Sequence, residues 1–281
     1  MSGSLRDVRD ERGEVVAVDL LGGGMVEVSV RLPHLAATAR PGQFAQLRCS
    51  DGFDPLLRRP FSVAWTEGDV AVFVLAPVGV GTRVLASLRR GDSLTALGPL
   101  GSGFTSDTAA RRALCVSGGL GCAPFPLLIR SLRNQGKAVT VVSGAGNAAL
   151  LYPAARFARG DDEVTVVELT VDGSRGVRGV VTDAVAANLD EQTAVYGCGP
   201  NPMLAELART VDACAAQPTL AEVSLEAPMG CGFGTCLGCA LPVHNDEGGT
   251  AWALCCTAGP VMSLRTVAWE ELSKLPAAHV A

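Results

Sequence analysis

Five of the ten cysteines of this chain lie close together near its C-terminal end. Cys231, Cys236 and Cys239 have the spacing C-x4-C-x2-C, and the adjacent pair Cys255 and Cys256 follows. This spacing, completed by a fourth and more distant cysteine, is the plant-type arrangement of thiolates around a [2Fe–2S] cluster. The sequence therefore predicts such a cluster, with either Cys255 or Cys256 as the fourth ligand.

Glycines between these cysteines support the same interpretation. Gly232, Gly234 and Gly238 allow positive φ angles, so the backbone can wrap closely around a small inorganic core. A structural zinc site is the alternative. Zinc sites usually combine two C-x2-C pairs, and only one such pair is present here. A non-catalytic, zinc-stabilised binding protein therefore remains a second hypothesis.

Two segments in the first third of the chain have residue types that suit phosphates and a flavin. Arg59 and Ser62 open a predicted strand, where the arginine offers a planar set of donors and the serine can donate or accept. Gly81 and Thr82 begin a predicted short helix, whose N-terminal amides suit a pyrophosphate. Each segment alone is a weak signal, and together they indicate a nucleotide-containing cofactor.

Two glycine-rich turns follow in the middle of the chain. Gly118, Gly119 and Gly121 lie in the pattern G-G-x-G-x-x-P between a predicted strand and a predicted helix. Cys198-Gly199-Pro200 lies between a later strand and another helix. Ligands of open α/β sheets bind at the carboxyl ends of the strands, so both turns are candidates for a dinucleotide site. A structural turn and a small buried cysteine are the alternatives.

The elements that must position these residues change in type along the chain. Residues 13–100 contain short β-like runs separated by turn signals, which is typical of a small closed barrel or sandwich. Strand and helix patterns then alternate, as in a parallel α/β sheet. We predict a multi-domain chain with an antiparallel β-barrel over residues 1–104, an α/β parallel-sheet nucleotide domain over 105–216, and a small Cys-rich [2Fe–2S] β domain over 217–281.

The composition excludes several function classes. Hydrophobic residues make up 48% of the 281 residues and the formal net charge is −5, so the chain is neither a disordered segment nor a nucleic-acid binder by charge. The longest stretches without charged residues, 138–155 and 227–245, are interrupted by polar residues, glycine or proline, so no membrane span is expected. The N-terminal residues contain no apolar core like that of a signal peptide, which predicts a cytoplasmic location.

The order of the motifs adds a family resemblance. Four motifs follow one another in the order found in ferredoxin–NADP reductase-like flavoproteins: R-P-x-S, G-x-G-T, G-G-x-G-x-x-P and C-G-P. With the C-terminal cysteines, the chain resembles the electron-transfer subunits of class 1B dihydroorotate dehydrogenases, over about residues 14–270. In that family C-x-x-G-P-V contains the last ligand, and here this motif begins at Cys256. The resemblance therefore favours Cys256 over Cys255.

The resemblance also implies the other site residues. It implies FAD contacts from Arg59, Pro60, Phe61, Ser62, Val74, Leu75, Ala76, Gly81 and Thr82. The two glycine-rich turns, with Gly118, Gly119, Gly121, Cys198, Gly199 and Pro200, are expected to bind the nicotinamide cofactor. The implied cluster ligands are Cys231, Cys236, Cys239 and Cys256.

The implied function is electron transport in pyrimidine biosynthesis. An FMN-containing catalytic partner would oxidise dihydroorotate, and this chain would carry the electrons through [2Fe–2S] and FAD to NAD+, within a heterotetramer. No catalytic residue is expected in this chain, since His34, His244 and His279 lie outside any active-site-like motif. Residues 143–147 contain no basic side chain for a 2′-phosphate, so NAD is expected rather than NADP. An NAD(P)H-dependent reductase for another redox partner is the alternative within the same fold.

Overall fold

The first part of the chain is a closed antiparallel barrel. The computed structural model describes residues 7–275, so the outer ends of the predicted domains 1–104 and 217–281 lie outside the described residues. The barrel strands are β1 (Arg9–Leu20), β2 (Val26–Arg31), β3 (Phe44–Leu47), β4 (Arg59–Glu67), β5 (Val70–Leu75) and β6 (Ser93–Leu100), which close in the order β1-β2-β5-β4-β3-β6. Alternate side chains of these strands, including Val28, Leu47 and Phe73, fill the interior. The predicted barrel is confirmed.

Short helices and turns accompany the barrel strands. Helices α1 (Pro33–Thr38) and α2 (Val80–Ala86) follow β2 and β5, and a 3-10 turn at Gly22–Gly24 joins β1 to β2. Helix α2 begins at the segment in which a short helix is predicted.

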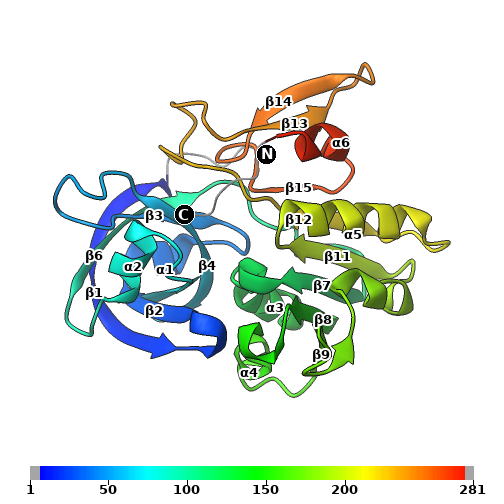
Figure 1. Cartoon of the computed structure of the whole chain (residues 1–281), viewed down its shortest axis with the longest axis horizontal. Coiled ribbons are helices and arrows are strands. Elements are labelled where there is room, and N and C mark those ends of the chain that lie inside the picture. The colour runs from blue at the N-terminus through cyan, green and yellow to red at the C-terminus, as the bar shows by residue number, and fades with distance from the viewer. Residues whose placement is uncertain (1–6, 276–281) are drawn as a thin grey trace.

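The second part is a sheet of seven strands beside the barrel (Figure 1). Its strands are β7 (Arg112–Gly118), β8 (Ala138–Ala145), β9 (Val164–Thr170), β10 (Val177–Arg178), β11 (Thr193–Cys198), β12 (Leu220–Ser224) and β15 (Val261–Ser263), in the order β10-β9-β8-β7-β11-β12-β15. The pairings are parallel up to β12, and β15 is antiparallel to it. The connections contain helices α3 (Phe125–Arg133), α4 (Ala154–Ala158) and α5 (Asn201–Ala213), and 3-10 turns at Gly119–Cys122, Ala148–Leu150, Val181–Ala184 and Ala186–Asn188.

The cysteine-rich region leaves this sheet and returns to it. Strand β12 precedes the cysteine loop, the hairpin of β13 (Ala240–His244) and β14 (Thr250–Leu254) follows, and β15 rejoins the sheet beside β12. Helix α6 (Trp269–Ser273) then packs near β13.

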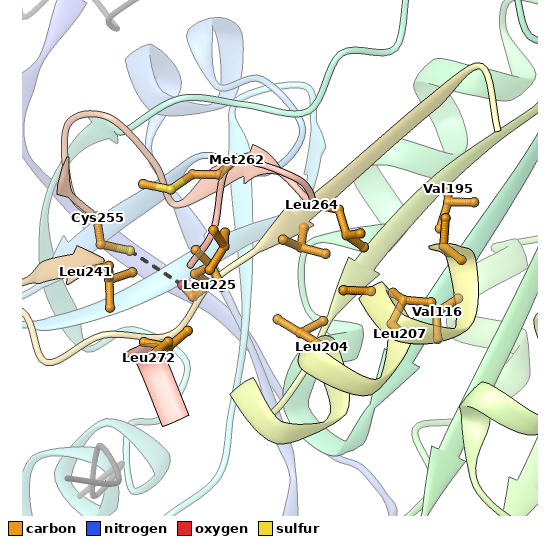
Figure 2. Close-up of a cluster of buried hydrophobic side chains, with 14 of the residues drawn as sticks. Val116, Val195, Leu204, Leu207, Leu225, Leu241, Cys255, Met262, Leu264 and Leu272 are labelled. Carbon is orange, nitrogen blue, oxygen red and sulfur yellow. Dashed lines mark hydrogen bonds between the residues drawn. The ribbon is translucent and has the colours of Figure 1, made fainter. Parts of the chain in front are cut away.

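One apolar core joins the cysteine-rich region to the sheet. Figure 2 shows Leu204 of α5 near Leu264 and Leu207 of α5 beside Val116, in one buried cluster that also includes Leu225 and Met262. Phe44 and Leu100 of the barrel belong to the same buried cluster. Within residues 7–275, no helix combines the length and the apolar character that a bilayer crossing requires.

Candidate functional site

The four predicted cluster ligands form two pairs of sulfur atoms. The backbone amide of Cys236 lies 3.5 Å from the sulfur of Cys231, and its thiol also contacts that sulfur. In the second pair, Cys239 Sγ lies 3.2 Å from Cys256 Sγ. A [2Fe–2S] cluster takes two protein ligands at each of its irons, so two pairs of thiols suit it.

The loop that carries the first pair is built to hold a thiolate. Burial by itself would raise the pKa of the Cys231 thiol, but hydrogen bonds from the backbone of Cys236 and Phe233 and from the Cys236 thiol lower it to about 6. Gly232 and Gly234 have φ angles of +83° and +91°, which turn the backbone around the Cys231 sulfur. The loop therefore favours the deprotonated form that binds metal.

The two adjacent cysteines of the fourth-ligand segment have different surroundings. The backbone amide of Cys256 lies 3.4 Å from Cys239 Sγ, so Cys256 closes the cysteine loop. Cys255 is fully buried, and its thiol donates to the carbonyl of Leu225 at 3.6 Å within the apolar core (Figure 2). Burial raises the pKa of both thiols, that of Cys256 to about 12.

The sulfur atoms of the cysteine-rich region are arranged as two pairs. Within residues 7–275, no three His, Cys, Asp or Glu side chains lie together as the ligands of one metal ion do. The ten cysteines are all unbridged.

The structure brings the two predicted phosphate-binding segments of the barrel together. Arg59 on β4 lies over the first turn of α2, and a Cβ atom added at Gly81 would lie 3.2 Å from Arg59 Nε. The hydroxyl of Thr82 accepts from the amide of Gly79 at 2.8 Å, which fixes the start of the helix. Thr82 is buried, and its hydroxyl is engaged with the backbone of Gly79.

The remaining predicted barrel residues lie on two adjacent strands. Pro60, Phe61 and Ser62 follow Arg59 along β4, and Val74 and Leu75 end β5. Leu75 belongs to the barrel core, whereas Val74 packs in the cluster that β4 shares with the nucleotide sheet.

The two glycine-rich turns also come together, because β7 and β11 are neighbours. Ser117 of β7 is paired with Cys198 of β11, so the turns leave the sheet side by side. A Cβ atom at Gly121 would lie 2.2 Å from the Cys198 carbonyl oxygen, and only glycine allows this approach. A Cβ atom at Gly199 would lie 2.8 Å from the side-chain methyl carbon of Met203 in α5. Cys198 is buried, and burial raises its thiol pKa.

A cavity of ≈ 490 Å³ lies where these turns meet the barrel. Gly118, Gly119 and Pro200 line it from the sheet side, and Ala76 lines it from the barrel side. Gly121, Cys198 and Gly199 are not among its lining residues. Its lining also includes residues that the sequence motifs did not indicate, namely Met25, Gly144, Ala145, Gly146 and Met203. Three of these residues, Gly144, Ala145 and Gly146, lie in the segment 143–147, which the sequence indicated only by its lack of a basic side chain.

Comparisons with known proteins agree with this geometry. A family model described as the iron-sulfur cluster binding domain of dihydroorotate dehydrogenase B matches residues 226–268. The dihydroorotate dehydrogenase B (NAD(+)) electron transfer subunit of Desulforamulus reducens is 36% identical over 261 residues, which are 92% of this chain and 97% of the relative. The subunit of the same name from Bacillus caldolyticus is 36% identical, over 89% of this chain and 95% of the relative.

Solved structures show the same fold. An NADH-dependent reduced ferredoxin-NADP oxidoreductase, studied for flavin-based electron bifurcation, matches with a TM-score of 0.80 at 26% identity, over 93% of this chain and 91% of that chain. A ferredoxin reductase of carbazole 1,9a-dioxygenase matches over 75% of this chain and 69% of that chain with a TM-score of 0.63. At 24% identity the second match supports the fold alone. From the paired cysteines, the two-domain cavity and these relatives, the chain belongs to the family of electron transfer subunits of dihydroorotate dehydrogenase B.

Proposed function

We propose that this chain carries electrons from an FMN-containing dihydroorotate dehydrogenase catalytic subunit to NAD+ in pyrimidine biosynthesis, and that it holds a [2Fe–2S] cluster and FAD for this purpose. The observation that carries the proposal is the pairing of Cys231 with Cys236 and of Cys239 with Cys256. We assign these four thiols as the ligands. Cys255 is assigned to the apolar core, where its thiol already has a partner.

FAD is assigned to the outer face of the barrel. When bound, FAD exchanges electrons singly or in pairs, which matches a one-electron cluster to a two-electron nicotinamide. Arg59 over the first turn of α2 would bind the pyrophosphate with its guanidinium and the amides of Gly81 and Thr82. The other assigned contacts are Pro60, Phe61, Ser62, Val74, Leu75 and Ala76. Leu75 would contribute only its backbone, because its side chain fills the barrel.

NAD is assigned to the cavity between barrel and sheet. Gly118 and Gly119 leave backbone exposed to a dinucleotide, and Pro200 bounds the cavity. Gly121, Cys198 and Gly199 support this wall from behind by close packing. The lining at Gly144–Gly146 offers no cation to a 2′-phosphate, which supports NAD over NADP.

The catalytic partner is assigned to the surface around the cysteine loop. Phe233 and Leu237 expose large apolar side chains there, and Leu237 is 64% exposed. Grouped exposed apolar side chains mark interaction sites. We propose that the partner covers them in a cytoplasmic heterotetramer, and that the base for substrate oxidation belongs to that partner.

The test compares two adjacent cysteines. The wild-type complex and the variants Cys256→Ala and Cys255→Ala are purified anaerobically, and iron, sulfide, zinc and flavin are measured with the EPR spectrum after dithionite. We expect Cys255→Ala to keep the iron and the signal of one reduced cluster, whereas Cys256→Ala loses both. The reverse pattern would reject the ligand assignment.

The same preparation tests the activity. The co-purified complex should reduce NAD+ with dihydroorotate as the electron donor. Zinc in place of iron, or an iron-containing protein that reduces only other acceptors, would reject the proposed function.

A further inference from the structure

Gln46 is a fully buried polar residue whose role neither the fold nor the assigned cofactor contacts explain. It lies in the middle of β3 and has no solvent exposure. Neither its Nε2 nor its Oε1 has a hydrogen-bond partner among residues 7–275. Buried amides in native proteins are almost always paired, so this side chain calls for a partner that the polypeptide does not supply.

The strand register places Gln46 on the face of the barrel to which the flavin is assigned. Gln46 is paired with Pro60 of β4, and Phe44 is paired with Ser62. Cross-strand partners share one face of a sheet, so Gln46 projects on the same side as Ser62. The neighbouring residues Ala45 and Leu47 point to the other side, into the barrel.

The Gln46 carboxamide also lies against the cysteine loop. A Cβ atom added at Gly232 would lie 2.7 Å from Gln46 Nε2, so only glycine fits between the amide and the loop. Gly232 directly follows Cys231, the first assigned ligand. The unpaired amide is therefore located between the two cofactor sites and in contact with one of them.

We propose that Gln46 is a positioning residue of the iron–sulfur site, whose carboxamide N–H donates to a sulfur atom of the cluster held by the Cys231 loop. This inference rests on the proposed [2Fe–2S] site. A donor to a cluster sulfur stabilises the reduced, more negative cluster and so raises its reduction potential. Gln46 then couples the barrel strand beside the flavin to the electron affinity of the cluster.

The first experiment measures reduction potentials in the complex. Gln46→Met keeps the length and the apolar part of the side chain and removes the donor. We expect an EPR-monitored titration to show that electron uptake by the cluster is about tenfold less favourable, which is about 59 mV for a one-electron couple. The flavin potential, followed by visible absorption, should be unchanged. An unshifted cluster potential, or a shift of the flavin alone, would overturn the inference.

Gln43→Met is the matched control. Gln43 is also buried and lies beside the same strand, but both ends of its amide are paired: its Oε1 accepts from Arg40 and its Nε2 donates to Gly101 at 2.8 Å. We expect this variant to lose stability and to keep the cluster potential. Equal shifts in both variants would show a general packing effect and overturn the inference.

A second measurement needs no variant at the site. Pulsed EPR of the reduced wild-type complex, labelled with ¹⁵N in glutamine side chains, should show a nitrogen coupling to the cluster. Its absence in a protein with full iron content would overturn the inference and leave the proposed function intact. Missing iron or a missing cluster signal would instead reject the proposed function itself.

Discussion

The barrel is joined to the rest of the molecule through two interfaces of different chemistry. Towards the sheet it combines apolar packing of Ala64 and Val74 with charge: the buried Glu27 of β2 binds Arg156 at 2.7 Å and Arg159 at 2.9 Å. The guanidinium carbons of Arg130 and Arg159 lie 4.2 and 4.8 Å from the ring centre of Trp65. Towards the cysteine-rich region it uses backbone hydrogen bonds and apolar packing.

The second interface is centred on the segment that ends the barrel. The amide of Ser102 donates to the carbonyl of Gly259 at 2.6 Å, and its hydroxyl donates to that of Val261 at 3.0 Å. Phe44 and Leu100 continue the apolar core from the barrel into this region. Both interfaces are closely packed, so they differ in their polar contacts. Side-chain ion pairs join the barrel to the sheet domain, whereas backbone hydrogen bonds join it to the cysteine-rich region.

The largest effect is expected from breaking the charged interface at its buried carboxylate. Glu27→Ala leaves two partly buried arginines without their shared partner, which costs about 3–5 kcal/mol, with the lower end expected because Arg156 also contacts Asp19. Urea unfolding of the purified complex measures this loss. Asp69→Asn, which removes the exposed partner of Arg31, should change stability by less than about 0.5 kcal/mol. Similar losses of unfolding free energy in the two variants would contradict the idea that burial makes the Glu27 ion pairs stronger than the exposed one.

The apolar interface is tested at Leu225, where β12 leads into the cysteine loop. Leu225→Ala removes a buried side chain beside Cys255 and is expected to cost about 2–5 kcal/mol. Because Leu225 and the cysteine-rich region share one apolar core, the variant should also lose iron faster than the wild type on exposure to a chelator. Leu20→Ala, at an exposed position of β1 far from the cysteine loop, is the control for stability. A destabilised Leu225→Ala protein with normal iron retention would show that core and loop are independent.

A smaller effect is expected at the aromatic contact of the charged interface. Trp65→Leu removes the ring between two guanidinium groups and should cost about 1–2 kcal/mol, whereas Trp65→Phe should retain part of the interaction. Thermal or urea unfolding measures both variants. Trp252→Leu changes an exposed tryptophan and should be close to neutral. Equal unfolding free energies of Trp65→Leu and Trp65→Phe would show that the cation–π interaction contributes nothing to stability.

The smallest effect is expected at Glu226, a half-buried carboxyl near the apolar interface. Partial burial raises the pKa of Glu226, so its ionisation opposes folding once the pH exceeds the unfolded-state pKa of about 4.3. Glu226→Gln should therefore raise the urea midpoint at pH 8 and change it less near pH 4. Glu206→Gln, on the exposed face of α5, should show no such trend. A pH-independent effect of Glu226→Gln would refute this explanation.

Much of this organisation could be predicted from local patterns. Turn residues between β-branched runs located the barrel strands, and the spacing of Cys231, Cys236 and Cys239 indicated the cluster loop. The paired glycine-rich turns were recognisable because each lies between a strand and a helix. Each of these signals is contained within a few consecutive residues, which is why sequence alone was sufficient.

Features that depend on distant packing could not be predicted in this way. The different surroundings of Cys255 and Cys256 follow from which face of the hairpin end meets the core, and spacing alone left the fourth ligand open. Gln46 occupies an alternate position in an otherwise apolar strand, and only the approach of Gly232 makes it conspicuous. Residues 220–224 and 261–263 had no signal that they would extend the nucleotide sheet, because their partners are supplied by strands elsewhere in the chain.

The return of the chain to the sheet has a consequence for how the metal site is assembled. Ser224 of β12 is paired with Val261 of β15, so the whole cysteine-bearing excursion begins and ends at one point of a hydrogen-bonded sheet. Pairing of β12 with β15 closes this loop, so part of the closure entropy is offset by backbone hydrogen bonds and not by metal binding. Metal binding then has to order only the local turns around the thiols. A maturation machinery could therefore deliver iron and sulfide to a chain that is already folded, and removal of the metal would open the loop without unravelling the sheet that anchors it.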